Sequence, residues 1–222
     1  MNQDMLETEG WTVIEGLLSA GLCQSIAEGF DNPKLYRSKV VMERHGYGRG
    51  VYQYFAYPLP DPIQTLRQDY YPQLAQIANR WNKLLDIPAR YPATHEEFKA
   101  ICHSEGQKRP TPLLLRYEPG DYNCLHQDLY GPLVFPLQMA ILLSEPGRDF
   151  TGGEFVITEQ RPRRQSRPIV VPLKQGDAVV FPVHHRPVES VRGVSRATMR
   201  HGVSRLISGR RHTLGVIFHD AA

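Results

Sequence analysis

The sequence is poor in cysteine. Its 222 residues include only Cys23, Cys102 and Cys124, and their spacing matches no metal-binding pattern. Such an odd, widely spaced set predicts reduced thiols, which are typical of a cytosolic protein, and argues against a disulfide-stapled secreted scaffold. We expect Cys124, two residues before a histidine, to be a small apolar filler and not a metal ligand.

Long hydrophobic runs are lacking as well. No apolar stretch approaches the roughly 20 residues of a membrane-spanning helix, and the polar start MNQDMLETEG does not resemble a signal peptide. Hydrophobic residues nevertheless make up 41% of the chain, and the mean hydropathy is −0.40. We therefore expect a cytoplasmic protein with a folded core and no membrane association, formed by residues 1–222 as a single domain.

A large net charge is also lacking, since the formal value at pH 7 is +3. The charges are unevenly spread: residues 161–211 hold twelve Lys and Arg against two acidic residues, whereas residues 1–160 hold fourteen against twenty. This asymmetry is compatible with a basic face for an anionic partner such as nucleic acid. It is equally compatible with arginines on solvated strand faces.

The first half of the chain, residues 1–111, shows mainly helical signals, and we expect it to support the second half. A short strand at residues 10–14 precedes a helix with Ser19 as its N-cap. Apolar spacing predicts helix over residues 63–87, with Leu84 on the buried face and with Pro72 and Pro88 at the ends of its second helix.

A third helix is predicted by the capping box of Thr94 and Glu97. We expect His95 and His103, both in this helix, to be exposed.

Residues 31–62 are the least regular stretch and contain HGYGRGVYQYFAYPLPDP. The glycines allow close backbone approach or movement. The aromatic residues, interleaved with Arg44 and Arg49, suit the stacking of a flat substrate such as a base. Two interpretations follow: a substrate lid, or a loop whose aromatic side chains pack over the core.

From residue 112 onward the pattern changes to short strands. We expect them at residues 113–117, 135–144, 153–160, 168–172, 178–182, 198–203 and 212–218, separated by turn clusters such as SEPGRDFTGG. Many short strands without intervening helices indicate a jelly roll. The predicted fold class is α+β: a cupin-like double-stranded β-helix over residues 112–222, with a helical N-terminal buttress.

One constellation points to metal chemistry. His126 and Asp128 form an H-x-D pair, and side chains two residues apart in an extended segment point the same way. His201 lies well downstream and supplies a third ligand. Two histidines and one carboxylate on one face of an ion form the facial triad of non-heme Fe(II) oxygenases. His184 and His185 are the rivals of His201.

Arg211 follows His201 by ten residues. Its planar guanidinium suits the distal carboxylate of 2-oxoglutarate, and Thr213, two residues on, would point the same way and add a hydroxyl donor. Arg210 is the rival for this role, but a shift of one residue would place it on the opposite strand face.

With these motifs, residues 113–218 resemble the Fe(II)/2-oxoglutarate dioxygenase superfamily. The run from Tyr117 to Asp128 is similar to AlkB-type demethylases, and the HGV…GRRHT tail to prolyl 4-hydroxylases. The whole chain more closely resembles an uncharacterised bacterial family of candidate nucleic-acid-modifying dioxygenases. The resemblance implies that Tyr117 hydrogen-bonds the co-substrate. The chain departs from the AlkB pattern at Leu115, where Asn is usual, and at Ile217, where a second Arg is usual.

Two further residues, Tyr122 and Gln138, are weaker candidates for the pocket lining, and Gly152-Gly153-Glu154 is interpreted as a structural turn. The resemblance implies an enzyme that uses Fe(II), 2-oxoglutarate and O2 to hydroxylate a C–H bond, with oxidative demethylation of a nucleic-acid base as one such reaction. The alternatives are a hydroxylase of a protein side chain or a metabolite, and a non-catalytic cupin-like binding module.

Overall fold

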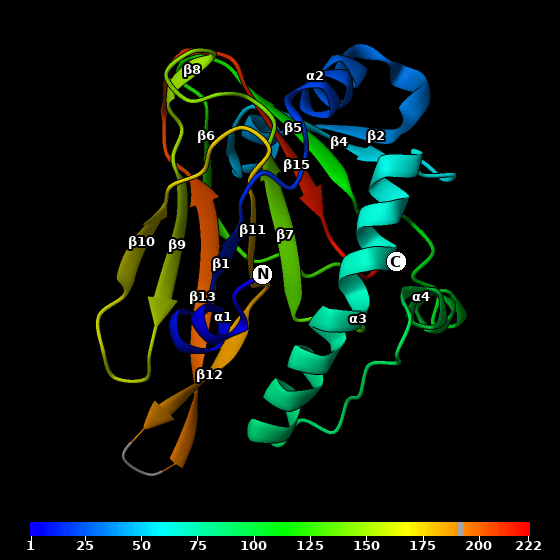
Figure 1. The fold of residues 1–222 in the computed structure, drawn as a ribbon, viewed down its shortest axis with the longest axis vertical. Helices are drawn as coiled ribbons and strands as arrows, with labels where there is room; N and C mark the ends of the chain where they lie inside the picture. Colours follow the sequence, from blue (N-terminus) through cyan, green and yellow to red (C-terminus); the bar gives the residue numbers. More distant parts are fainter. Residues whose placement is uncertain (191–192) are drawn as a thin grey trace.

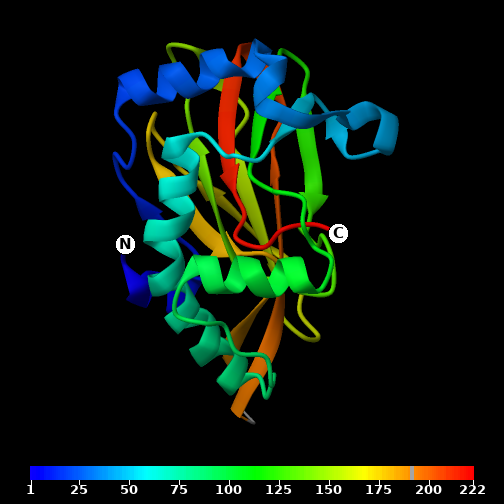
Figure 2. The same cartoon turned by 90° about the vertical axis from the view of Figure 1, so that its right-hand side faces the viewer.

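The computed structural model describes residues 1–190 and 193–222 and has three layers (Figure 1). Two antiparallel sheets face each other, and helices cover the outer face of the larger sheet (Figure 2). The helices are α1 (Gln3–Glu9), α2 (Ala20–Glu28), α3 (Asp61–Leu84) and α4 (His95–Ser104), with short 3-10 turns η1 (Gly29–Asp31), η2 (Pro33–Leu35) and η3 (Met42–His45). No helix within this description is long and apolar enough to cross a membrane.

The larger sheet has seven strands. Their spatial order is β1 (Thr12–Ile14), β11 (Ala178–Pro182), β7 (Leu137–Leu142), β15 (Arg211–Val216), β5 (Leu113–Tyr117), β4 (Val51–Phe55) and β2 (Tyr36–Val41). Strands from the first 111 residues therefore extend both edges of this sheet.

The smaller sheet has the order β10 (Arg167–Val171), β9 (Phe155–Gln160), β13 (Gly193–Val203), β6 (Tyr122–His126) and β3 (Gly48–Arg49), and β12 (His185–Ser190) also pairs with β13. A separate ribbon joins β14 (Leu206–Gly209) to β8 (Phe150–Gly152).

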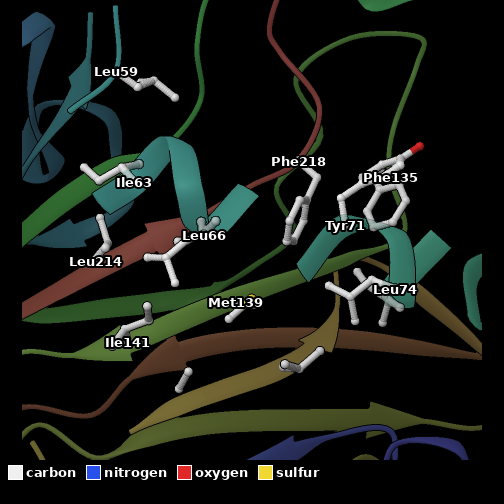
Figure 3. Close-up of a cluster of buried hydrophobic side chains, with 14 of the residues drawn as sticks. Leu59, Ile63, Leu66, Tyr71, Leu74, Phe135, Met139, Ile141, Leu214 and Phe218 are labelled. Atoms are coloured by element: carbon white, nitrogen blue, oxygen red, sulfur yellow. The ribbon is translucent and has the colours of Figure 1, made fainter. Parts of the chain in front are cut away.

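Burial patterns explain the layers. Every residue of β7 is buried, because one face packs on the helices and the other faces the smaller sheet. Strand β9 instead alternates buried and half-buried residues, as expected when only one face meets the core. Figure 3 shows the helix-facing core, in which Leu66 and Leu74 of α3 lie over Met139 and Ile141 of β7 and Leu214 of β15.

The strand predictions for residues 113–117 and 178–182 match β5 and β11. Residues 31–62, the stretch expected to be the least regular, contain two strands that were not predicted: β2 pairs with β4, and β4 pairs with β5. Polar and apolar residues do not alternate regularly along β2 and β4, so the local sequence pattern does not indicate these strands. The pairing of β4 with β5 also joins segments that are distant in sequence.

Helix α3 also corrects the sequence interpretation. It runs through Pro72 without ending, so Pro72 does not begin a second helix. Leu84, expected on the buried face, is the last residue of α3 and is 53% exposed. The capping box of Thr94 and Glu97 is confirmed at the start of α4.

His95 is buried, contrary to expectation, and its Nε2 lies 3.0 Å from the carbonyl oxygen of Phe218. Burial lowers the pKa of His95 to about 3, so its ring is neutral. His103 is partly buried and lies 2.8 Å from Asp220 Oδ2. Both rings contact the C-terminal segment, which no local pattern in the sequence could indicate.

Asp220 also binds Arg67 of α3 at 2.9 Å, and both side chains are fully buried. Tyr57 donates a hydrogen bond to the same carboxylate at 2.7 Å. This group therefore ties the C-terminus to α3 and to the segment before it.

Two of the three cysteines, Cys23 and Cys102, are buried, as suits small apolar residues. Cys124 is exposed, so the filler interpretation is wrong for it.

Candidate metal centre

Two neighbouring strands bring the H-x-D pair and His201 together. His126 is the last residue of β6, and His201 lies on β13 as its direct antiparallel partner. Asp128 follows β6 by two residues. One ligand atom from each of the three side chains lies within 4.8 Å of the others. The convergence expected from the spacing is therefore present.

The hydrogen bonds of His126 orient its free nitrogen. Its Nδ1 lies 2.8 Å from the carbonyl oxygen of Cys124. A carbonyl can only accept, so Nδ1 carries the proton, and the lone pair of Nε2 is left for a metal. That Nε2 is 3.6 Å from Asp128 Oδ1.

His201 lies deeper, against Phe155 and Phe181. Burial and then the neighbouring His126 lower the pKa of His201, so its imidazole is neutral and able to bind a metal. Its Nε2 is 3.3 Å from Asp128 Oδ2.

Asp128 is buried, yet it is ionised. Burial alone raises its pKa, but the hydrogen bond from His201 and the two imidazoles outweigh that effect, so the pKa lies below its usual range. Tyr130 also contributes by donating a hydrogen bond to Asp128 Oδ1 at 2.7 Å. The centre thus offers two imidazoles and a carboxylate, a donor set that fits Fe(II).

Arg211 begins β15 and is 1% exposed. Within residues 1–190 and 193–222 no carboxylate oxygen lies within 4.0 Å of its guanidinium, and its Nε has no hydrogen-bond partner there. Burial lowers the pKa of Arg211 to about 10, which still leaves it charged at neutral pH. A buried cation without a counter-ion is costly, and an anionic ligand would offset that cost.

The residues around Arg211 suit such a ligand. Its Nη1 donates to Thr213 Oγ1 at 2.5 Å, and Tyr117 is its direct partner on β5. Tyr117 is fully buried and accepts a 3.4 Å hydrogen bond from Asn123. Gly153 has φ +64°, and a Cβ there would lie 3.0 Å from Arg211 Cδ, so this turn packs directly against the arginine.

A single cavity of about 500 Å³ joins these groups. His126, Asp128 and His201 line it together with Tyr117, Arg211 and Thr213. Gln138 also lines the cavity, whereas Tyr122 is 39% exposed and is not among the lining residues.

The rivals lie elsewhere. His184 and His185 are outside the three-ligand cluster, although Gln127 links the two regions by donating to the carbonyl oxygen of His184 at 3.2 Å. Arg210 is exposed and lies 3.4 Å from Glu118.

Part of the basic stretch 161–211 is used internally. Arg186 is buried against Glu159, and Arg161 contacts the same carboxylate at 2.7 Å. Among the described residues of this stretch, Arg186 and Arg161 therefore serve the fold through Glu159.

Three further tyrosines line the cavity: Tyr52 and Tyr54 on β4, which belong to the aromatic residues expected to suit a flat substrate, and Tyr130 after β6, which was not predicted. Alternation along β4, which puts Tyr52 and Tyr54 on one face, was the only available signal. Alternation alone does not indicate which face of β4 lies toward the metal centre.

The chain matches one family of known proteins and two relatives in sequence. A family model described as "Oxygenase, catalysing oxidative methylation of damaged DNA" matches residues 50–221. Two uncharacterised proteins of Mycobacterium tuberculosis, from strains CDC 1551 / Oshkosh and H37Rv, are each 49% identical over 168 residues, which is 76% of this chain and 72% of theirs.

Solved structures show the same fold. A Pseudomonas putida prolyl-4-hydroxylase has a TM-score of 0.52 at 16% identity, with 99% of this chain and 97% of that chain covered. A Burkholderia pseudomallei oxidoreductase of the 2OG-Fe(II) oxygenase family has a TM-score of 0.54 at 17% identity, with 99% and 90% covered. At these identities the likeness concerns the fold alone.

Proposed function

Because the chain belongs to the Oxygenase-NA family, we propose that it is a 2-oxoglutarate- and Fe(II)-dependent oxygenase that hydroxylates a C–H bond of a modified nucleic-acid base. The family implies Fe(II) and 2-oxoglutarate as its requirements. The observation that carries the proposal is one cavity containing both a three-ligand cluster and a buried, unpaired arginine.

In this proposal His126, Asp128 and His201 hold the metal, and Arg211 and Thr213 bind the distal carboxylate of 2-oxoglutarate. Tyr117 closes the cavity beside that carboxylate. We infer further that the two sheets form a double-stranded β-helix within one domain, in which residues 112–222 supply the core and residues 1–111 its support.

With Fe(II) bound, 2-oxoglutarate and O2 give succinate and CO2, and the second oxygen atom converts a C–H bond of the substrate to C–OH. When that carbon is an N-methyl group, the product loses formaldehyde and the base is demethylated. The chain's own groups contribute position: Tyr130 and the Cys124 carbonyl orient two ligands, and the buried Arg211 fixes the acid in a site that excludes water.

The family description favours a nucleic-acid substrate. The prolyl hydroxylases share only the fold, so they add no support for a protein substrate. We therefore retain hydroxylation of a protein side chain or a metabolite as an outcome of the test below.

The test begins anaerobically. Fe(II) and 2-oxoglutarate should give a weak visible charge-transfer band with the wild-type protein, and His126→Ala should abolish it. Oxygen is then added with N-methylated single-stranded oligonucleotides, unmodified ones or proline-containing peptides, and succinate and formaldehyde are measured. We expect methylated strands to raise both products. Absence of the band would contradict the oxygenase proposal, and stimulation by peptides alone would replace the nucleic-acid substrate with a protein.

A further inference from the structure

Exposed apolar side chains surround the cavity mouth. Tyr47, Leu125 and Leu129 all line the cavity, and they are 49%, 48% and 50% exposed. Leu125 and Leu129 directly flank the H-x-D pair in the sequence. We call these three residues the mouth rim. Large apolar side chains that remain exposed together beside a cavity indicate a surface that meets a partner.

The rim includes a preformed stack of flat rings. Tyr47 lies on His45 with ring centroids 5.3 Å apart and an interplanar angle of 22°. Both residues are exposed, so the pair is accessible to another ring. Such aromatic faces bind bases with little sequence preference, because every base has a π-face.

The backbone holds this stack in place. The backbone carbonyl oxygen of Tyr47 accepts a 2.9 Å hydrogen bond from the N–H of Cys124, two residues before His126. Gly48 has φ +121°, and a Cβ there would lie 2.4 Å from the carbonyl oxygen of Tyr122. Met42, at the start of η3, is fully buried. The stack is therefore fixed to the strand that carries His126. Gly48 allows the two backbones to approach closely.

Charges beside the stack favour an anionic chain. Arg44, next to His45, is exposed and has no acidic group within ion-pair distance among the residues that the structure describes. Arg49 is 53% exposed at its side chain, and its ion pairs with Glu43 and Asp121 are long, at 3.9 and 4.0 Å. Such exposed pairs are weak and open readily to a phosphate.

We propose that the mouth rim binds single-stranded nucleic acid, with Tyr47 stacking on the base next to the one in the cavity. This inference rests on the proposed function and extends it. A base can enter the cavity only when it is unpaired, so its neighbour on a single strand is free to stack on Tyr47. A duplex would keep that neighbour paired.

The test measures binding without turnover. The protein is loaded anaerobically with Fe(II) and 2-oxoglutarate, and fluorescence anisotropy follows a fluorescein-labelled oligodeoxythymidylate, as a single strand and annealed to its complement. We expect Tyr47→Ala to weaken single-strand binding roughly tenfold and Tyr47→Phe to restore it. Ile207→Ala, at a 65% exposed apolar residue of β14 that does not line the cavity, is the matched control and should bind normally.

The outcomes separate the two proposals. If wild type shows the charge-transfer band and binds the single strand, but Tyr47→Ala binds equally tightly, the rim inference is wrong and the proposed function stands. Equal binding of duplex and single strand also overturns the rim inference. If the band forms and no oligonucleotide binds, the nucleic-acid substrate and the rim inference both fail, while the oxygenase chemistry remains.

Discussion

Two buried arginines lie in very different surroundings. Arg67 is completely enclosed, and its guanidinium contacts the buried carboxylate of Asp220 at 2.9 Å. Arg211 is 1% exposed, yet among the described residues its guanidinium donates a hydrogen bond only to the hydroxyl of Thr213 and has no carboxylate oxygen within 4.0 Å. A buried charge that is paired within the chain serves the fold. A buried charge without a counter-ion points to a ligand that brings one.

The same contrast separates the two ends of β15, which begins at Arg211 and is followed by Phe218 and Asp220. Around Arg67 every partner belongs to the chain, including the carbonyl oxygen of Phe218 at 2.8 Å. Around Arg211 the partners Tyr117 and Thr213 line the cavity that also contains the metal centre. We therefore expect mutations in the first region to change stability, and mutations in the second to change ligand binding.

The largest effect should follow from breaking the Arg67 pair. Asp220→Asn leaves a buried guanidinium without its counter-ion, so the free energy of unfolding should fall by about 3–5 kcal/mol at pH 7. Glu118→Gln, which removes an exposed partner of Arg210, should cost less than about 1 kcal/mol. Urea unfolding of both variants checks this. Equal losses would show that the buried pair contributes no more than a surface pair.

The difference between wild type and Asp220→Asn should also depend on pH. Burial raises the pKa of Asp220, but Arg67, His103 and Tyr57 lower it more, so the folded pKa is depressed. The carboxylate's contribution is therefore present above the unfolded pKa of about 3.9 and is lost as the pH falls through the folded value.

Arg211→Met should weaken ligand binding and leave stability intact, which is the opposite of what we expect for Asp220→Asn. Loss of a charge-assisted, two-point contact should raise the Kd for 2-oxoglutarate about 100-fold, corresponding to about 2.7 kcal/mol. Stability without ligand should stay the same or increase, because an unpaired buried charge is removed. Titration of the charge-transfer band gives the Kd, and Arg210→Met is the control. An unchanged Kd together with a large loss of stability would make Arg211 structural.

The sequence predicts the role of Arg211 but not that of Arg67. The H-x-D pair, His201 and Arg211 were identifiable because a strand places alternate residues on one face, and the spacing of ten residues separated Arg211 from Arg210. Arg67 and Asp220 are 153 residues apart, and no local pattern links a helix interior to a C-terminal segment. Tyr130 was missed for the same reason, since non-local strand pairing places it in the cavity.

Tyr130 allows a finer test of the metal centre. Tyr130→Phe removes the hydrogen bond to Asp128 and should weaken Fe(II) binding about tenfold, as loss of a ligand-orienting contact typically does. Tyr91→Phe removes a comparable 2.7 Å hydrogen bond, to the carbonyl oxygen of Val134, and is the matched control. Anaerobic metal titration and urea unfolding should show similar stability losses in both, with weaker Fe(II) binding in Tyr130→Phe alone.

The last prediction concerns acid sensitivity. Because the folded pKa of His95 is about 3, the unfolded state binds an extra proton below about pH 6.5, so stability falls as the pH falls. His95→Gln should make the dependence of stability on pH between 6 and 4 shallower by about 1.4 kcal/mol per pH unit. Unfolding curves across that range measure it, and an unchanged slope would mean that His95 is protonated in the folded protein.

The most direct measurement is a crystal structure of the protein grown anaerobically with Fe(II) and 2-oxoglutarate. We expect the ion to be bound by His126 Nε2, His201 Nε2 and an Asp128 oxygen, with the distal carboxylate of the acid on Arg211 and Thr213. An ion bound elsewhere, or a co-substrate whose carboxylate does not reach Arg211, would contradict the account.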